Sequence, residues 1–178
     1  MALYEFEGKK PQIPSDSFVH PNAVLIGDVR IGHECLIAPG VSIRADCGPV
    51  IIGDRSNIQD NAVIHVNENS QVTIEDNVTV AHGVTLHDVH IHSRCMIGIG
   101  AIVLFSVICE EDVFVSAGSL VPRGMHIPAG KIVVGSPARI TRDVTDRDKA
   151  VAKDGIEAYR LLCRQYLTTM KIVRSTKT

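Results

Sequence analysis

Branched apolar residues recur every six positions along most of this sequence, beginning with Ile31, Ile37 and Ile43. The series continues with Ile52, Ile58 and Ile64, then Ile74, Val80 and Leu86, then Ile91, Ile97 and Val103, and finally Ile108, Val115 and Val121, with some steps one residue short or long. A period of six matches neither the 3.6-residue turn of a helix nor the simple alternation of a long strand. It suits short strands that are separated by sharp corners and wound into a solenoid. The pattern therefore predicts an all-β solenoid.

The interior of this solenoid is expected to be uniform. Of the 178 residues, 45% are hydrophobic but only 4% are aromatic, and Trp is absent, so Val, Ile, Leu, Ala and Cys must build the core. A second small or apolar residue lies two positions before most of the repeated residues. Cys35 and Cys95 are among these, and we interpret both as small core fillers. The length favours a single domain.

The repeat resembles that of the hexapeptide-repeat proteins, whose left-handed parallel β-helix uses three hexapeptides for each triangular coil. The resemblance covers roughly residues 18–138, and the left hand is implied by the resemblance alone. We accordingly expect a β-helix domain with a short N-terminal cap over residues 1–140.

A helical segment is expected after the repeat, over residues 141–178. The repeat ends at the stretch IVVGSPAR, and Thr145 is a suitable N-cap because Asp148 follows three residues later. Apolar residues then fall at helical spacing to about Val173; they are Ile156, Tyr159, Leu162, Cys163, Tyr166 and Leu167. We expect this segment to lie along the outside of the solenoid, and Gly155 leaves open whether it forms one helix or two.

Charge and cysteine content exclude several classes of partner. A formal net charge of −2 predicts binding neither to nucleic acid nor to an anionic membrane. The first residues, MALYEFEGKKPQIP, carry two glutamates and no apolar signal region, so a cytoplasmic protein is expected. The five cysteines are scattered and form no CxxC pair, which favours reduced thiols.

Two columns of polar residues follow from the repeat if three hexapeptides make one coil. Arg44, His65 and His87 each come directly after a repeated apolar residue, one coil apart, so they should stack. Because neighbouring strands lie about 4.8 Å apart, two stacked imidazoles can reach one metal ion. Asp60 and His82 stack in the same way on a neighbouring face.

The second column cannot readily reach the first within one chain, but it can in an assembly. If copies pack around a threefold axis, His82 of one subunit can reach the His65 and His87 pair of the next. Arg44 then faces Asp60 across the interface, and Gln59 approaches the metal. Isolated histidines are usually plain surface residues, and that interpretation is given to His20, His33, His90, His92 and His126. Asn57, Asp60 and Asn61 could equally be ordinary corner residues.

Four stretches resemble the γ-class carbonic anhydrase family: SIRAD, GDRSNIQDNAVIH, AHGVTLH and IPAGKIVVGSPAR. The resemblance implies a homotrimer that binds Zn²⁺, or Fe²⁺ or Co²⁺, through residues matching His65 and His87 of one chain and His82 of the next. It also implies that Gln59 contacts the metal-bound solvent, and it places Arg44, Asp46 and Asp60 at the interface. The implied reaction is the hydration of CO₂ to bicarbonate, by water that the metal acidifies to a pKa near 7.

Three departures from that family bear on the reaction. Cys47 stands where well-studied members carry a glutamate, and the acidic loop after the first ligand is reduced to VNENSQ, which leaves Glu68 as its only carboxylate and candidate proton shuttle. If Tyr159 matches the family's helix tyrosine, Leu161 replaces its asparagine. Three alternatives to CO₂ hydration therefore stay open: an acyl-CoA thioesterase, an acyltransferase of the hexapeptide-repeat type that uses no metal, and a structural homologue of low activity.

Overall fold

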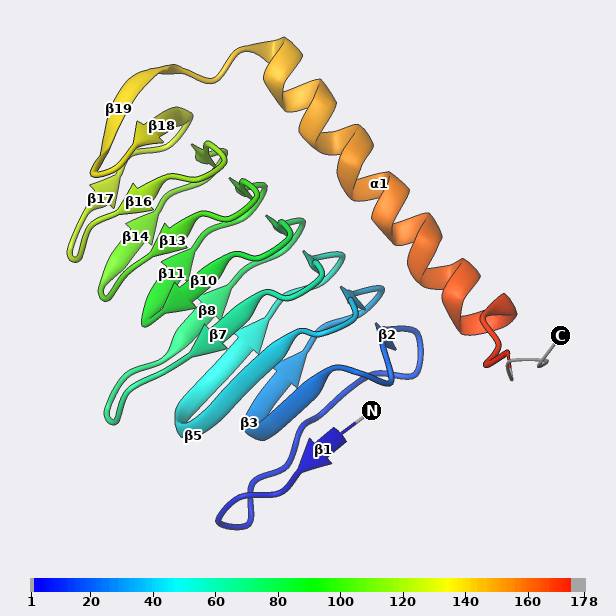
Figure 1. The fold of residues 1–178 in the computed structure, drawn as a ribbon. Helices are drawn as coiled ribbons and strands as arrows, with labels where there is room; N and C mark the ends of the chain where they lie inside the picture. The colour runs from blue at the N-terminus through cyan, green and yellow to red at the C-terminus, as the bar shows by residue number, and fades with distance from the viewer. Residues whose placement is uncertain (1, 174–178) are drawn as a thin grey trace, which may run out of the picture.

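The computed structural model describes residues 2–173, which form a left-handed parallel β-solenoid with one long helix at its side (Figure 1). The solenoid has three faces, and two of them belong to one continuous sheet. The first face consists of β1 (Ala2–Tyr4), the first halves of β3 (Val24–Ile31) and β5 (Ser42–Ile52), β7 (Val63–His65), β10 (Thr85–His87), β13 (Ile102–Val103) and β16 (Leu120–Val121).

The second face continues the same sheet because β3 and β5 run through the corner between the two faces. It consists of the second halves of β3 and β5 with β8 (Val72–Ile74), β11 (Val89–Ile91), β14 (Val107–Cys109) and β17 (His126–Ile127). The third face is a separate sheet made of β2 (Phe18–Val19), β4 (Leu36–Ile37), β6 (Asn57–Ile58), β9 (Thr79–Val80), β12 (Met96–Ile97), β15 (Phe114–Val115), β18 (Lys131–Gly135) and β19 (Ala138–Asp143). Only β19 is antiparallel to its neighbour in that sheet.

The repeated apolar residues line the interior, as predicted, with one exception. Ile108 is 38% exposed, whereas Cys109 is fully buried and pairs with Ile91 of the coil before. The prediction that Ile108 points inward was therefore wrong by one residue. Six-residue steps run without interruption from Val103 through Cys109 to Val115, and a cysteine packs there as a small apolar side chain.

The predicted core cysteines are confirmed. Cys35 and Cys95 are buried, and burial raises the pKa of the Cys35 thiol to about 12. Such a thiol stays protonated at neutral pH and fills space rather than reacting.

A single helix, α1 (Asp146–Thr169), follows the solenoid. Thr145 is its N-cap, and a capping box with Asp148 is complete, as the sequence predicts. The helix passes through Gly155 without a break and ends at Thr169, not near Val173. The change from strand to helix falls between Asp143 and Asp146, and residues 174–178 of the expected helical segment lie outside the described residues.

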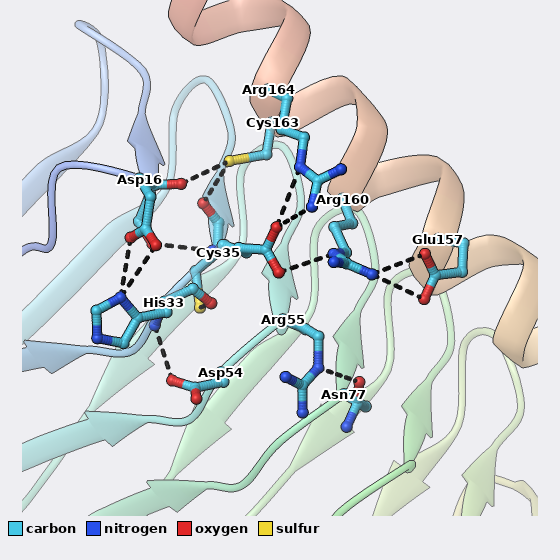
Figure 2. Close-up of polar contacts among 12 residues, drawn as sticks. Asp16, His33, Cys35, Asp54, Arg55, Asn77, Glu157, Arg160, Cys163 and Arg164 are labelled. Atoms are coloured by element: carbon cyan, nitrogen blue, oxygen red, sulfur yellow. Dashed lines mark hydrogen bonds and ion pairs between the residues drawn. The ribbon is translucent and has the colours of Figure 1, made fainter.

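Helix α1 runs back along the third face from the last coils to the first (Figure 1). Figure 2 shows Arg160, Cys163 and Arg164 extending from the helix toward the first coils. Arg160 and Arg164 both donate hydrogen bonds to Glu34, and the Cys163 thiol donates to the Cys35 carbonyl at 3.1 Å. The second half of the helix is therefore held by charge as well as by apolar packing.

Replacing Glu34 should loosen this attachment. The hydrogen bond from Arg164, helped by Arg160 and opposed by burial, holds the pKa of Glu34 below its usual value. The contribution of ionised Glu34 to the free energy of unfolding is then fully present above its unfolded-state pKa of about 4.3. It is lost as the pH falls through the lower pKa that Glu34 has in the folded protein. Because ion pairs of this kind contribute little individually, we expect Glu34→Gln to lower Tm by about 1–4 °C at pH 7. Thermal melts of both proteins at pH 7 and pH 3 check this, and a difference of the same size at both pH values would contradict it.

No helix among residues 2–173 is both long and apolar enough to span a lipid bilayer.

Candidate functional site

The predicted first column exists. Arg44 on β5 pairs with His65 on β7, and His65 pairs with His87 on β10, so the three side chains leave successive coils at one corner. His65 Nδ1 lies 2.8 Å from His87 Nε2, with the rings nearly perpendicular. Both histidine side chains are about four-fifths buried. The solenoid register therefore brings together two imidazole nitrogens that are 22 residues apart in the chain.

Carboxylates flank this pair. Asp46 Oδ1 lies 3.4 Å from His65 Nε2, and Arg44 donates to the other Asp46 oxygen at 2.7 Å. Burial acts to raise the pKa of Asp46, but the hydrogen bond and charge of Arg44 outweigh it and lower that pKa. Burial, then the charge of Arg44, lowers the pKa of His65. At neutral pH His65 is thus an uncharged imidazole beside an ionised carboxylate, which is the state that binds metal.

The pair fits a metal ion whose remaining ligands come from elsewhere. The outer ring nitrogens of the pair, His65 Nε2 and His87 Nδ1, and the nearby Asp46 Oδ1 are buried without a hydrogen-bond partner in the described part of the chain, whereas His65 Nδ1 and His87 Nε2 face each other. Two imidazoles bound to one tetrahedral Zn²⁺ at about 2.0–2.1 Å have nitrogens about 3.3 Å apart, close to the 2.8 Å separation found here. The role of these histidines as ligands stays a prediction.

The second column also exists, at the preceding corner. His82 Nδ1 lies 2.9 Å from Asp60 Oδ2, and both side chains are almost half exposed. A carboxylate at Nδ1 fixes the tautomer with its proton there, which leaves Nε2 as a free electron-pair donor. Within residues 2–173, His82 makes no hydrogen bond to His65 or His87, so its donor nitrogen is available to a second molecule.

His82 also lines a groove between the third face and α1. The groove has a volume of about 420 Å³ and its walls are mostly apolar. The solenoid contributes Gln59, Thr79, Ala81, His82, Met96, Gly98, Ile99, Val115, Ser116 and Ala117, and the helix contributes Val151, Ala152, Gly155 and Tyr159. Gln59 is buried, and its amide donates to Asn57 at 2.9 Å. The predicted residues Gln59, His82 and Tyr159 thus share one groove.

The structure leaves Glu68 and Leu161 outside both columns. Glu68 lies exposed on the loop between β7 and β8, where its charge acts on Cys47 and no hydrogen bond to His65 or His87 is found among the described residues. Leu161 is 55% exposed. The pKa of the Tyr159 hydroxyl is raised, mainly by burial and then by the negative charge of Asp60 nearby. Within residues 2–173, the histidine pair therefore has beside it neither the Glu68 carboxylate nor a side-chain amide at position 161.

Sequence reasoning missed two neighbours of His87. Asp88 is buried with a positive φ of 51°, accepts two hydrogen bonds from Asn67, and lies 3.2 Å from His87 Nδ1. The ring of Phe105 packs against the His87 ring with centroids 4.2 Å apart. Asp88 directly follows a predicted ligand, which is the pattern of a residue that orients it, whereas Phe105 lies one coil away and has no such pattern.

Comparison with known proteins agrees with this architecture. Residues 10–45 match the model of the family described as bacterial transferase hexapeptide (six repeats). The carnitine operon protein CaiE of Salmonella agona is 34% identical over 174 residues, which is 96% of this chain and 88% of that protein. Among solved structures, a putative acetyltransferase from Bacillus cereus is 36% identical with a TM-score of 0.93, covering 95% of this chain and 98% of that one. A hexapeptide transferase family protein from Anaplasma phagocytophilum is 33% identical with a TM-score of 0.89, covering 93% and 98%.

The fold and its stacked histidines define a hexapeptide-repeat β-helix protein whose polar columns lie at two corners of the coil. The chain belongs to the γ-class carbonic anhydrase-like family of hexapeptide-repeat proteins, with CaiE among its relatives.

Proposed function

We propose that this protein is an acyl-CoA-dependent enzyme that acts as a homotrimer, with each active site shared between two chains. The observation that carries the proposal is the apolar groove lined by His82, whose Nδ1 is bonded to Asp60 so that its Nε2 is left as the free donor. An apolar groove of this volume suits the acyl part of a thioester better than it suits CO₂ or bicarbonate, which have no apolar chain to bury. The names of the two structural relatives, a hexapeptide transferase and a putative acetyltransferase, also favour acyl chemistry.

His65 and His87 of one chain and His82 of its neighbour would hold a metal ion, with Zn²⁺, Fe²⁺ or Co²⁺ as the candidates. When bound, such an ion supplies Lewis acidity and an acidified water at an open coordination position.

The protein's own residues prepare this site. Asp60 holds the His82 ring by Nδ1 and leaves its Nε2 free, and Asp88 lies beside Nδ1 of His87, whose Nε2 is directed at His65. Arg44 holds Asp46 beside His65. The Gln59 amide lies in the groove where it would orient the attacking water or the thioester carbonyl, and Tyr159 closes the groove from the helix side. The apolar wall excludes bulk water from the acyl chain.

A panel of acyl-CoA thioesters tests the proposal. Metal-loaded protein should release CoA from at least one of them, and addition of amine or alcohol acceptors tells transfer from hydrolysis by the product formed. Release that survives a chelator would point to the acyltransferase that uses no metal. No release from any thioester at full metal occupancy would overturn the proposal and favour a structural homologue.

CO₂ hydration is the second candidate, because Arg44, Asp46, His65 and His87, which the resemblance links to this reaction, lie together at one corner. The structure places no carboxylate from the 66–71 loop against the histidine pair within the described chain. Since export of a proton is part of each turnover, we expect CO₂ hydration to be slow. Stopped-flow measurements on zinc-loaded and iron-loaded protein decide this.

Gly155 gives a sharper test of the groove. It lies on the groove side of α1, and a Cβ built there meets no atom within 4 Å in the described structure. The Cβ of Gly155→Leu therefore has room, and its longer side chain should occupy part of the groove, so we expect it to raise KM for long acyl-CoA thioesters by about tenfold or more. Gly155→Ala is the matched control and should leave KM unchanged while it strengthens the helix. An unchanged KM in Gly155→Leu would show that acyl chains bind elsewhere.

A further inference from the structure

A second group of metal-ligating side chains lies at the corner between the second and third faces. His90 Nε2 and His92 Nδ1 each lie 3.0 Å from the same oxygen, Oε1 of Glu75. The three donor atoms lie within 4.8 Å of one another. This corner is distinct from both the His65 and His87 pair and the His82 corner.

The solenoid register assembles this group. Ile74 on β8 pairs with Ile91 on β11, so the residues that follow them, Glu75 and His92, leave adjacent coils at one corner. His90 lies on β11 and His92 directly follows its last residue, Ile91; at this two-residue spacing an extended backbone directs both side chains to the same side. Their rings stack with centroids 4.0 Å apart and an angle of 16° between planes.

Glu75 also has a structural role, since its other oxygen accepts hydrogen bonds from the backbone and hydroxyl of Ser93. That role uses Oε2 and leaves Oε1 as the single target of both imidazoles. The contacts of Glu75 with Ser93 are complete without the imidazoles of His90 and His92, so they do not explain why both rings are directed at Oε1. Two imidazoles and one carboxylate, about one-third exposed, are a set that first-row divalent ions bind with positions left open for solvent.

We infer that Glu75, His90 and His92 bind a divalent transition-metal ion at a site separate from the shared histidine site. His90 also lines a hollow of about 220 Å³ together with Thr73, Asp88 and Ser106, so a small ligand can approach the ion from that side. The next carboxylate in the column, Glu110, is engaged by His126 at 2.7 Å and by the Ala129 backbone N–H. Because Glu75, His90 and His92 all come from one chain, this site does not depend on the trimer or on the proposed reaction.

The test removes the other metal-binding groups first. A parent variant, Cys47→Ser/His65→Ala/His87→Ala, lacks the histidine pair and the exposed thiol beside it. Titration with Co²⁺, followed by visible absorption and by metal content after dialysis, should show one ion per chain. In this parent, His92→Ala and Glu75→Gln should each weaken Co²⁺ binding by at least about tenfold. Glu75→Gln keeps an acceptor for Ser93, so its effect separates ligation from folding.

His33→Ala is the matched control. His33 Nδ1 also faces a carboxylate, Asp16 at 3.0 Å, but no second imidazole joins that pair within the described residues. It should leave Co²⁺ binding unchanged. A parent that binds no Co²⁺ at micromolar concentration, or a His92→Ala protein that binds as well as the parent, would overturn the inference. Neither result bears on acyl-CoA turnover by the unmodified protein, so the two proposals fail independently.

Discussion

Mixing His65→Ala chains with His82→Ala chains should restore metal binding at the shared site, and activity, that neither variant has alone. Each homotrimer lacks a ligand at all of its sites, because His65 and His82 come from opposite sides of each shared site. In a mixed trimer, one chain can supply His65 and His87 while its neighbour supplies His82. The structural basis for this expectation is His82 Nε2, which the bond between Nδ1 and Asp60 leaves free.

Random assortment of the two kinds of chain sets how much metal binding and activity should recover. After unfolding and refolding a 1:1 mixture, about one interface in four should pair an intact His65 chain with an intact His82 chain in the right order. CoA release should therefore reach about a quarter of the unmodified protein's value, and so should metal content when all chains also carry Glu75→Gln, which removes the separate site. The control is a mixture of His65→Ala with His87→Ala, which should recover nothing because both residues come from the same side. No recovery in the first mixture, or an occupied shared site in His82→Ala alone, would show that the site is not shared; recovery in the control would show that His65 and His87 act from different chains.

Gly27→Ala should destabilise the protein strongly. Gly27 has a φ of +79°, and a Cβ built there would lie 2.2 Å from the Ala45 carbonyl oxygen of the next coil. The left-handed conformation and the forced separation of β3 and β5 together should cost about 2–5 kcal/mol in the free energy of unfolding. Because Ala45 lies between Arg44 and Asp46, metal affinity at the histidine pair should fall as well.

Gly124 provides the comparison for this effect. It has a φ of +72°, but a Cβ there meets nothing within 4 Å in the described part of the chain. Gly124→Ala should then cost only the conformational part, about 1–2 kcal/mol. Urea unfolding of both variants measures the difference, and equal losses would show that contact between coils contributes nothing at Gly27.

The polar columns could be predicted because the register of a solenoid is a counting problem. Once each coil takes three hexapeptides, Arg44, His65 and His87 must stack, and the structure places them so. The prediction of Ile108 as an inward residue was wrong because it departed from the strict count: six residues after Val103 is Cys109, and Cys109 is the buried one. Position in the repeat decides burial there, not side-chain size.

The groove and the second histidine cluster could not be found in the same way. The groove depends on where α1 docks, and a helical pattern in the sequence does not say which solenoid face the helix covers. The sequence offers Gly155 as a possible break in the helix, but in the structure Gly155 lies within α1 and lines the groove. His90 and His92 were each assigned to the surface because they were considered singly. The signal in the sequence was their two-residue spacing at the end of one strand, with Glu75 one coil earlier.

The return of α1 to the first coils gives the chain an order of assembly. Cys163 bonds to the carbonyls of Asp16 and Cys35, across sequence separations of 147 and 128 residues, whereas the coils contact only their neighbours. During synthesis the coils can form one after another, but the apolar third face stays uncovered until the helix has left the ribosome. The groove has one wall from the middle of the chain and one from α1, so it is completed only after nearly all of the chain has been made. A nascent chain halted before Asp146 would expose that face to chaperones and proteases. Covering of the third face by the helix therefore distinguishes complete chains from incomplete ones.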